Sequence, residues 1–156
     1  MLKLRIIVVD RTRSSFLKQG ESHYMDRLKR YARTEWIEVK PVKIKKGKPF
    51  AEIVAVEGIS LLNNILPRDY MVALDRSGRS FDSKGLAAWI EQLSLSHDRM
   101  AFVIGGPLGL SDGVLETAHA VFSLSSLTLT HEMSRLLLLE QLYRAFTIIR
   151  GEKYHK

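Results

Sequence analysis

The chain contains no cysteine and no long apolar run, and each absence excludes a class of protein. Without cysteine, neither a disulfide framework nor a thiolate metal site can form. No apolar stretch approaches the roughly 20 residues of a membrane-spanning helix, and the N-terminal run MLKLRIIVVD is too short in its apolar part for a signal peptide. No metal-ligating cluster is visible either. We therefore expect a soluble, cytoplasmic protein that needs no membrane and no metal.

A glycine loop is also missing where common nucleotide-binding folds carry one. The first predicted strand, 2–9, is followed by Asp10-Arg11-Thr12-Arg13, which contains no glycine. A dinucleotide-binding Rossmann domain or an ordinary Rossmann methyltransferase would place its glycine loop there. The later run GGPLG lacks the Gly-Lys-Ser/Thr that completes a P-loop. A conventional nucleotide-dependent enzyme is therefore disfavoured.

Positive charge is in excess, and one segment accounts for it. The net charge is +7, and residues 27–48 hold nine Lys or Arg against two Glu, which equals the whole excess. A concentrated basic segment favours a polyanionic partner such as nucleic acid. The alternative is a solvated basic surface. The candidate RNA-contacting residues of this segment are Lys43, Lys45, Lys46 and Lys48.

Apolar periodicity predicts alternating strands and helices within one domain, 1–156. The predicted strands are 2–9, 36–44, 70–74, 99–104 and 121–124. The predicted helices are 16–33, 50–65, 83–95, 111–120 and 132–149. This alternation favours an α/β fold with a mostly parallel sheet and helices on both faces. Pro41 suggests an edge position for the second strand.

Ligands of such folds bind outside the carboxyl ends of the strands. Three stretches fit that position, and they are Leu74–Gly78, Gly105–Gly109 and Leu124–Leu129. In the second, glycines leave room for a ligand against the main chain, and Pro107 stiffens the turn. The plainer alternative for this stretch is a tight strand-to-helix turn.

The last predicted helix is apolar on more than one face. A helix that covers one face of a sheet needs only a single apolar stripe, yet this helix contains the run LLLL followed by further apolar residues. The surplus suggests a second buried surface, most simply that of a symmetric homodimer. A central helix buried within one chain is the alternative.

Several runs carry a family resemblance. FVIGGPLGL and SLSSLTLTHEMSRLLLLEQLYRAFTIIRGEKYHK, together with ALDRSG and HYMDRLKRY, closely resemble the ribosomal large subunit methyltransferase H family. These proteins are small members of the SPOUT class of knotted methyltransferases. Two positions depart from the family pattern, since Leu108 stands where many members carry Glu and Thr130 where many carry Pro. Thr130 can still cap the last helix.

The resemblance implies a C-terminal trefoil knot, S-adenosylmethionine as cofactor, and methylation of N3 of a pseudouridine in 23S rRNA on the assembled ribosome. By position it assigns cofactor contacts to Leu74, Gly105, Leu124, Ser125, Ser126, Leu127, Thr128 and Leu129. An alternative function is a basic RNA-binding module of ribosome assembly without activity. Cofactor binding would separate the two.

Methylation of N3 requires loss of its proton, so the site needs a general base or a charged group that assists this loss. The candidate catalytic residues are His131, Arg144, Tyr154 and His155. A structural role for His131, which opens the last helix, is the alternative. Arg135 is a further candidate RNA contact, with pairing to Glu140 as its alternative. The aromatic, imidazole and cationic side chains of 151–156 suit the placement of a flipped base, and across a dimer they would complete the partner's site.

Overall fold

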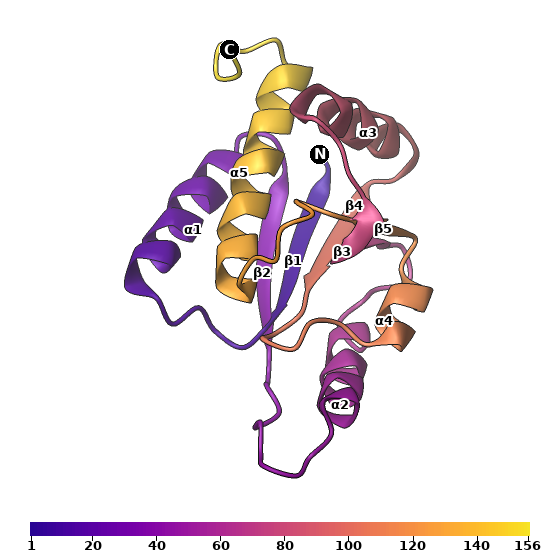
Figure 1. The fold of residues 1–156 in the computed structure, drawn as a ribbon. Helices are drawn as coiled ribbons and strands as arrows, with labels where there is room; N and C mark the ends of the chain where they lie inside the picture. The colour runs from indigo at the N-terminus through magenta and orange to yellow at the C-terminus, as the bar shows by residue number, and fades with distance from the viewer.

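The computed structural model describes all of residues 1–156 and shows one five-stranded sheet in the order β2-β1-β4-β3-β5 (Figure 1). Every strand pair is parallel, as the alternation of elements predicted. The strands are β1 (Lys3–Val9), β2 (Arg33–Val39), β3 (Tyr70–Arg79), β4 (Arg99–Ile104) and β5 (Ala120–Phe122). All carboxyl ends therefore meet at one edge of the sheet.

The helices cover both faces of this sheet. They are α1 (Ser15–Leu28), α2 (Phe50–Leu62), α3 (Ser83–Ser96), α4 (Asp112–Thr117) and α5 (His131–Ile149). The larger apolar core holds buried residues of α1, α3 and α5, and the smaller one holds those of α2 and α4. The predicted helices on both faces are thus confirmed, with three on one face and two on the other.

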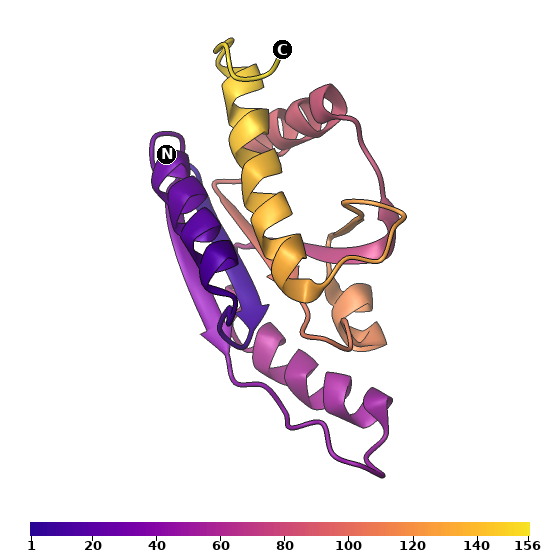
Figure 2. The same ribbon diagram turned by 60° about the vertical axis from the view of Figure 1, so that its left-hand side comes forward.

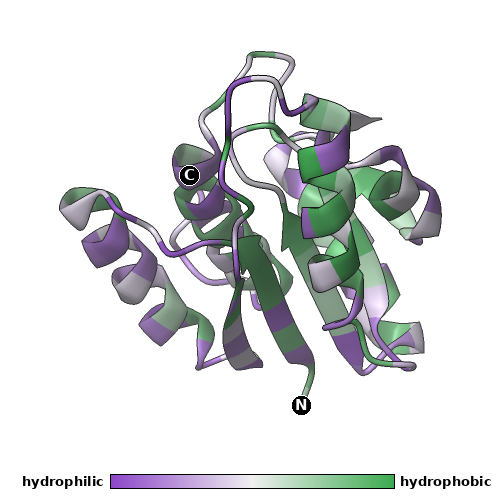
Figure 3. Ribbon diagram, turned by 90° about the horizontal axis from the view of Figure 1, so that it is seen from below, coloured by the Kyte–Doolittle hydropathy of each residue, from purple (hydrophilic) through white to green (hydrophobic).

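Strand residues alternate between the two cores because successive side chains of a strand point to opposite faces. In β4, Phe102 belongs to the larger core and Val103 to the smaller one, and both are fully buried. β1 follows the same alternation, with Ile6 and Ile7 on opposite faces. The central strands are accordingly apolar on both sides, and Figure 3 shows them mostly in the hydrophobic colour.

Helix α5 lies between α1 and α3 on the larger core (Figures 1 and 2). Leu136 packs so closely on α1 that a Cβ added at Gly20 would stand 2.8 Å from it. No residue of α5 is fully exposed. Much of the apolar surplus is therefore buried within the chain, as the single-chain alternative anticipated, and only half-buried residues such as Leu137 and Ile148 remain for a partner.

Several element boundaries differ from the predicted ones. Helix α1 ends at Leu28 rather than at Arg33, because Arg33 already pairs with Lys3 as the first residue of β2. β2 is an edge strand, as predicted, but it ends at Val39, before Pro41. Helix α3 begins at Ser83 as predicted, and Asp82 caps it by accepting the N–H of Gly85. Local patterns missed these boundaries because long-range pairing decides them.

The structure also bears on two further expectations. None of the helices combines the length and apolar character that a membrane span needs. The path of the chain is consistent with the trefoil knot that the resemblance implies, and the knot itself stays a prediction.

Candidate functional site

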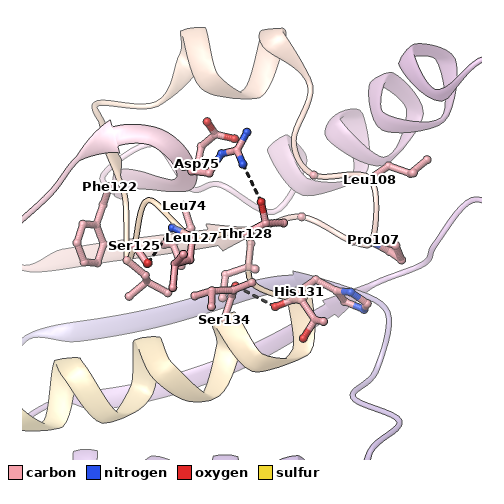
Figure 4. Close-up of a pocket in the computed structure, with 18 residues that line it drawn as sticks. Leu74, Asp75, Pro107, Leu108, Phe122, Ser125, Leu127, Thr128, His131 and Ser134 are labelled. Carbon is pink, nitrogen blue, oxygen red and sulfur yellow. Dashed lines mark hydrogen bonds between the residues drawn. The ribbon is translucent and has the colours of Figure 1, made fainter.

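A cavity of about 650 Å³ opens at the carboxyl ends of three neighbouring strands, β4, β3 and β5 (Figure 4). Its wall is built from the ends of those strands, the segments that follow them, and the first turn of α5. Seven of the eight residues that the resemblance assigned to a cofactor line it: Leu74, Gly105, Leu124, Ser125, Leu127, Thr128 and Leu129. The eighth, Ser126, is not among the lining residues. All three predicted stretches thus converge on one cavity.

Sequence reasoning missed several lining residues. Ile104, Phe122, Thr130 and Ser134 lie in or beside regular elements and also face the cavity. Phe122 is 3% exposed and packs with Phe81 at 5.8 Å between ring centroids. Its sequence signal is that of a core strand residue, so periodicity alone did not distinguish it from its neighbours.

The segment Gly105–Gly109, here called the glycine turn, forms one wall. Gly109 N–H donates to Gly106 O at 3.0 Å, which closes a turn with Pro107 at its second position. Gly109 has φ +81°, a backbone region that glycine enters freely. A Cβ on Gly105 would stand 2.5 Å from the carbonyl group of Gly109. Gly105 is therefore required by the turn itself, whatever the cavity binds.

The segment Leu124–Leu129, here called the pocket loop, forms the opposite wall. No residue in it takes part in a backbone-to-backbone hydrogen bond. Within the loop, the Ser125 hydroxyl accepts the N–H of Leu127 at 3.0 Å, and the hydroxyl of Ser123, just before the loop, donates to Ser125 O at 2.9 Å. The other main-chain N–H and C=O groups of this half-buried to exposed loop have no protein partner, so they are available to a ligand in the cavity.

The strand predicted over 70–74 is longer in the structure, because β3 extends to Arg79. Beyond Ala73 this strand has no pairing with β4. It carries Asp75 and Arg76 along the cavity, and Arg76 Nη1 donates to Thr128 Oγ1 at 2.7 Å. The carboxylate of Asp75 and the guanidinium of Arg76 therefore lie at the opening of a cavity whose other lining residues carry no formal charge.

Helix α5 begins at the cavity. Thr130 caps it by accepting the N–H of Met133, as predicted. His131 is among the residues that line the cavity, and its side chain is 23% exposed. Burial, and next the positive charge of Arg135, lower the pKa of His131. Its neutral form, which can accept a proton, is therefore favoured near neutral pH.

The other three candidate catalytic residues lie at the far end of α5. Arg144 is thirteen positions after His131, which is about 20 Å along the helix. It bonds Glu140 Oε1 through Nε at 3.1 Å and Nη2 at 2.5 Å, and lies 4.8 Å over the ring of Tyr154. Arg144 Nη1 is 3.3 Å from His155 Nδ1. These residues form one cluster, and it does not reach the cavity of its own chain.

The C-terminal tail, Gly151–Lys156, is folded back onto the helices. Gly151 has φ +67°, and the N–H of Glu152 bonds the carbonyl of Thr147 at 2.8 Å, a glycine-ended helix terminus. The Tyr154 hydroxyl donates to Glu140 at 3.0 Å. Burial, and next the contacts with Tyr24 and Glu140, raise the pKa of Tyr154 well above its usual value. Tyr154 is thus a protonated hydrogen-bond donor.

The assignment of Arg135 to RNA is wrong. Its side chain is fully buried and donates to Thr12 Oγ1 at 2.9 Å and to Val9 O at 2.5 Å. It does not pair with Glu140, the alternative considered from sequence, because Arg144 holds that carboxylate. A group with no exposed surface cannot contact a phosphate.

The basic segment is displayed on the surface. Its candidate RNA-contacting lysines lie in the connection between β2 and α2, here called the basic loop, residues 40–49. Lys43, Lys45 and Lys46 are exposed, Lys48 is half-buried, and none of the four forms an ion pair. The positive charges of this loop are therefore free for an outside partner.

Comparison with known proteins places the chain among methyltransferases. A family model described as "Predicted SPOUT methyltransferase" matches residues 2–155. A protein of Thermotoga neapolitana named ribosomal RNA large subunit methyltransferase H is 42% identical over 154 residues, covering 99% of each chain. Proteins of the same name from Halothermothrix orenii and Enterococcus faecalis are 42% and 38% identical over 159 residues, each covering 99% of this chain and 100% of theirs.

Solved structures show the same fold at lower identity. A probable methylase family protein from Haemophilus influenzae superposes with a TM-score of 0.58 at 15% identity, covering 98% of this chain and 70% of that one. A probable methyltransferase from Bordetella pertussis gives 0.56 at 15% identity, covering 92% and 96%. Together with the full-length family match, this shows that the chain belongs to the SPOUT methyltransferase family.

Proposed function

We propose that this methyltransferase uses S-adenosylmethionine to methylate N3 of a pseudouridine in 23S rRNA, on the assembled ribosome and so in the cytoplasm. The observation that carries the proposal is the pocket loop, which has no backbone-to-backbone hydrogen bond and lies beside a cavity at the carboxyl ends of three neighbouring strands. The printed names of the relatives support large-subunit rRNA as the substrate.

The cavity fits such a cofactor. Its volume of about 650 Å³ lies within the roughly 300–1,000 Å³ of small-molecule sites. Leu74, Leu124 and Leu129 supply apolar surface for a flat ring, and the free N–H and C=O groups of the pocket loop suit the polar edge of an adenine. When bound, the cofactor supplies a methyl group activated on a sulfonium. The protein holds this cofactor in place and excludes water from it.

The acceptor nitrogen carries a proton that must leave as the new N–CH₃ bond forms and the S–CH₃ bond breaks. His131 is a lining residue of the cavity, and its lowered pKa favours the neutral imidazole. It therefore suits a role in accepting that proton or in orienting the pocket loop. The cluster of Arg144, Tyr154 and His155 supplies cationic and aromatic groups for the phosphate and base of the RNA.

A homodimer would bring the two groups of residues together. Within one chain, about 20 Å of helix α5 separates His131 from Arg144. If both act on one nucleotide, the tail of one chain must approach the cavity of a second copy. The half-buried outer residues of α5 are available for such contact. We propose a composite site, with the cofactor in one chain and the tail residues of the partner placing the RNA.

Two chain variants test this arrangement. Deleting Tyr154–Lys156 should abolish methylation of 23S rRNA and leave S-adenosylmethionine binding intact. Ser125→Trp should fill the cavity, abolish cofactor binding and leave the melting temperature near that of wild type, because Ser125 lies in a loop without main-chain pairing. Mixing the two inactive chains should restore one working site per heterodimer. Full activity of the truncated chain would refute the role of the tail, and no recovery in the mixture would refute the cross-chain arrangement.

The alternative is a basic RNA-binding module without activity, which the exposed lysines of the basic loop favour. Calorimetry separates the two, because a pure binding module has no reason to bind S-adenosylmethionine. Mass spectrometry of 23S rRNA from a strain lacking this protein would identify the modified nucleotide. If no methyl group were lost from 23S rRNA, the proposed substrate would be wrong.

A further inference from the structure

The part of β3 that continues past β4 makes a contact that the proposed reaction does not explain. Residues 75–79 continue past the last β3–β4 pair, Ala73 with Val103. Arg76 is exposed on this extension, and its Nη1 atom reaches across the cavity mouth to Thr128 Oγ1 at 2.7 Å. Figure 4 draws this bond as the dashed line that ends at Thr128.

That bond is the single hydrogen bond that joins the pocket loop to another element of the fold. The loop has no backbone-to-backbone hydrogen bond, and its two other hydrogen bonds stay within Ser123–Leu127. The ends of the loop are fixed by β5 and by the Thr130 cap of α5. Between them, Thr128 is the one polar anchor.

We propose that Arg76 is a positioning residue of the cofactor site, acting through Thr128 to hold the pocket loop in its binding conformation. This inference rests on the proposed function, because it takes the pocket loop to bind S-adenosylmethionine. A loop without main-chain pairing loses conformational freedom when a ligand orders it. A bond that orders the loop beforehand removes part of that entropic cost and so increases affinity.

The competing explanation is that Arg76 contacts the bound cofactor directly. Variants of Thr128 distinguish this explanation from positioning through the loop. If Arg76 acts through Thr128, removing either partner weakens binding equally, and removing both weakens it no further. If Arg76 touches the ligand itself, Thr128→Val leaves affinity unchanged while Arg76→Ala reduces it. Valine is nearly isosteric with threonine, so the loop keeps its apolar packing.

The experiment measures S-adenosylmethionine and S-adenosylhomocysteine affinity by calorimetry on the full-length protein. Arg76→Ala, Thr128→Val and the double variant should each weaken binding by roughly three- to tenfold, the effect of one exposed hydrogen bond. Arg76→Lys and Thr128→Ser keep a donor and an acceptor and should recover most of the affinity. Arg79→Ala removes the same charge from the same strand, away from the cavity, and should bind like wild type.

Two further readouts separate positioning from general stability. Dissociation of the cofactor, followed by rapid mixing with competitor, should be faster in Arg76→Ala, whereas the melting temperature should stay near that of wild type. The KM for S-adenosylmethionine should rise more than kcat falls. If the wild-type protein binds no S-adenosylmethionine, the proposed function fails. If the wild type binds and Thr128→Val binds equally well, the positioning role of Arg76 is refuted while the proposed function stands.

Discussion

The guanidinium of Arg135, in α5, donates a hydrogen bond of 2.9 Å to the hydroxyl of Thr12, in the segment after β1. Thr12 in turn donates to the carboxylate of Glu21 in α1, and Arg135 also bonds the carbonyl of Val9. All three side chains are more than nine-tenths buried. The end of β1 and both flanking helices are therefore joined by one buried polar cluster beside the cavity.

Removing the cation of this cluster should destabilise the fold. Arg135→Met removes the cation that donates to Thr12 and to Val9 and leaves both acceptors buried, and we expect the free energy of unfolding to fall by about 3 kcal/mol. The double variant Arg135→Met/Glu21→Gln removes both charges and should recover part of the loss. Urea unfolding followed by circular dichroism measures both. Unchanged stability in Arg135→Met would show that the cluster contributes little.

The buried carboxylate of Glu57 should make the stability of the fold depend on pH. It is 4% exposed in α2, accepts the N–H of Val42 at 3.0 Å and has no salt-bridge partner. Burial raises its pKa above the usual 4.5. The ionised carboxylate therefore costs stability above the raised folded pKa, and this cost disappears as the pH falls through that value toward 4.5.

Glu57→Gln keeps an acceptor for Val42 and carries no charge. It should be more stable than wild type at neutral pH, and this advantage should shrink as the solution is acidified. Urea titrations from about pH 4 to about pH 8 measure the difference. Glu52→Gln, on the exposed side of the same helix, is the matched control. An advantage that is constant across this range would contradict the prediction.

The basic loop should contribute to RNA binding through phosphates. Replacing Lys43, Lys45, Lys46 and Lys48 together by Ser should weaken ribosome binding. Each lost phosphate contact should flatten the salt dependence by roughly 0.7–0.9 log units per log unit of salt. Lys18→Ser and Lys84→Ser, exposed on other helices, control for net charge. If the fourfold variant kept the wild-type affinity and salt slope, the loop would be only a solvated surface.

Gly151 should be intolerant of a side chain. Its φ of +67° is strained for any other residue, so Gly151→Ala should lower stability by about 1 kcal/mol. Gly113 is the matched control, because it lies within α4 with a nearest contact of 3.9 Å for an added Cβ. Gly113→Ala should be neutral or slightly stabilising. Thermal melts measure both variants, and a melting temperature of Gly151→Ala equal to that of Gly113→Ala would contradict the prediction.

The element order was predictable from sequence because apolar periodicity is a local property. All five strands and five helices occur where the pattern placed them, although individual ends differ by up to five residues. The cavity was predictable because ligands of parallel sheets bind at the carboxyl ends, and the three stretches named from sequence converge there. The extension of β3 was not, since Asp75–Ser80 has the composition of a turn.

The role of Arg135 could not be read from the sequence because it depends on partners more than a hundred residues away. The helical pattern places Arg135 on a face and does not say what covers that face. The same limit applies to Gly105. Its place beside a ligand was expected, and its close contact with Gly109 was not, since only the folded turn brings the two together.

The position of β1 in the sheet has a consequence for how the chain folds. Lys3 pairs with Arg33 on one side and with Arg99 on the other. During synthesis, β1 can join β2 early, and its second edge then stays open until β4 has been made. An open edge rich in Ile and Val invites pairing with other chains, and such distant pairing slows folding. We therefore expect chains truncated before β4 to aggregate, and refolding to be slow compared with helical proteins of the same length.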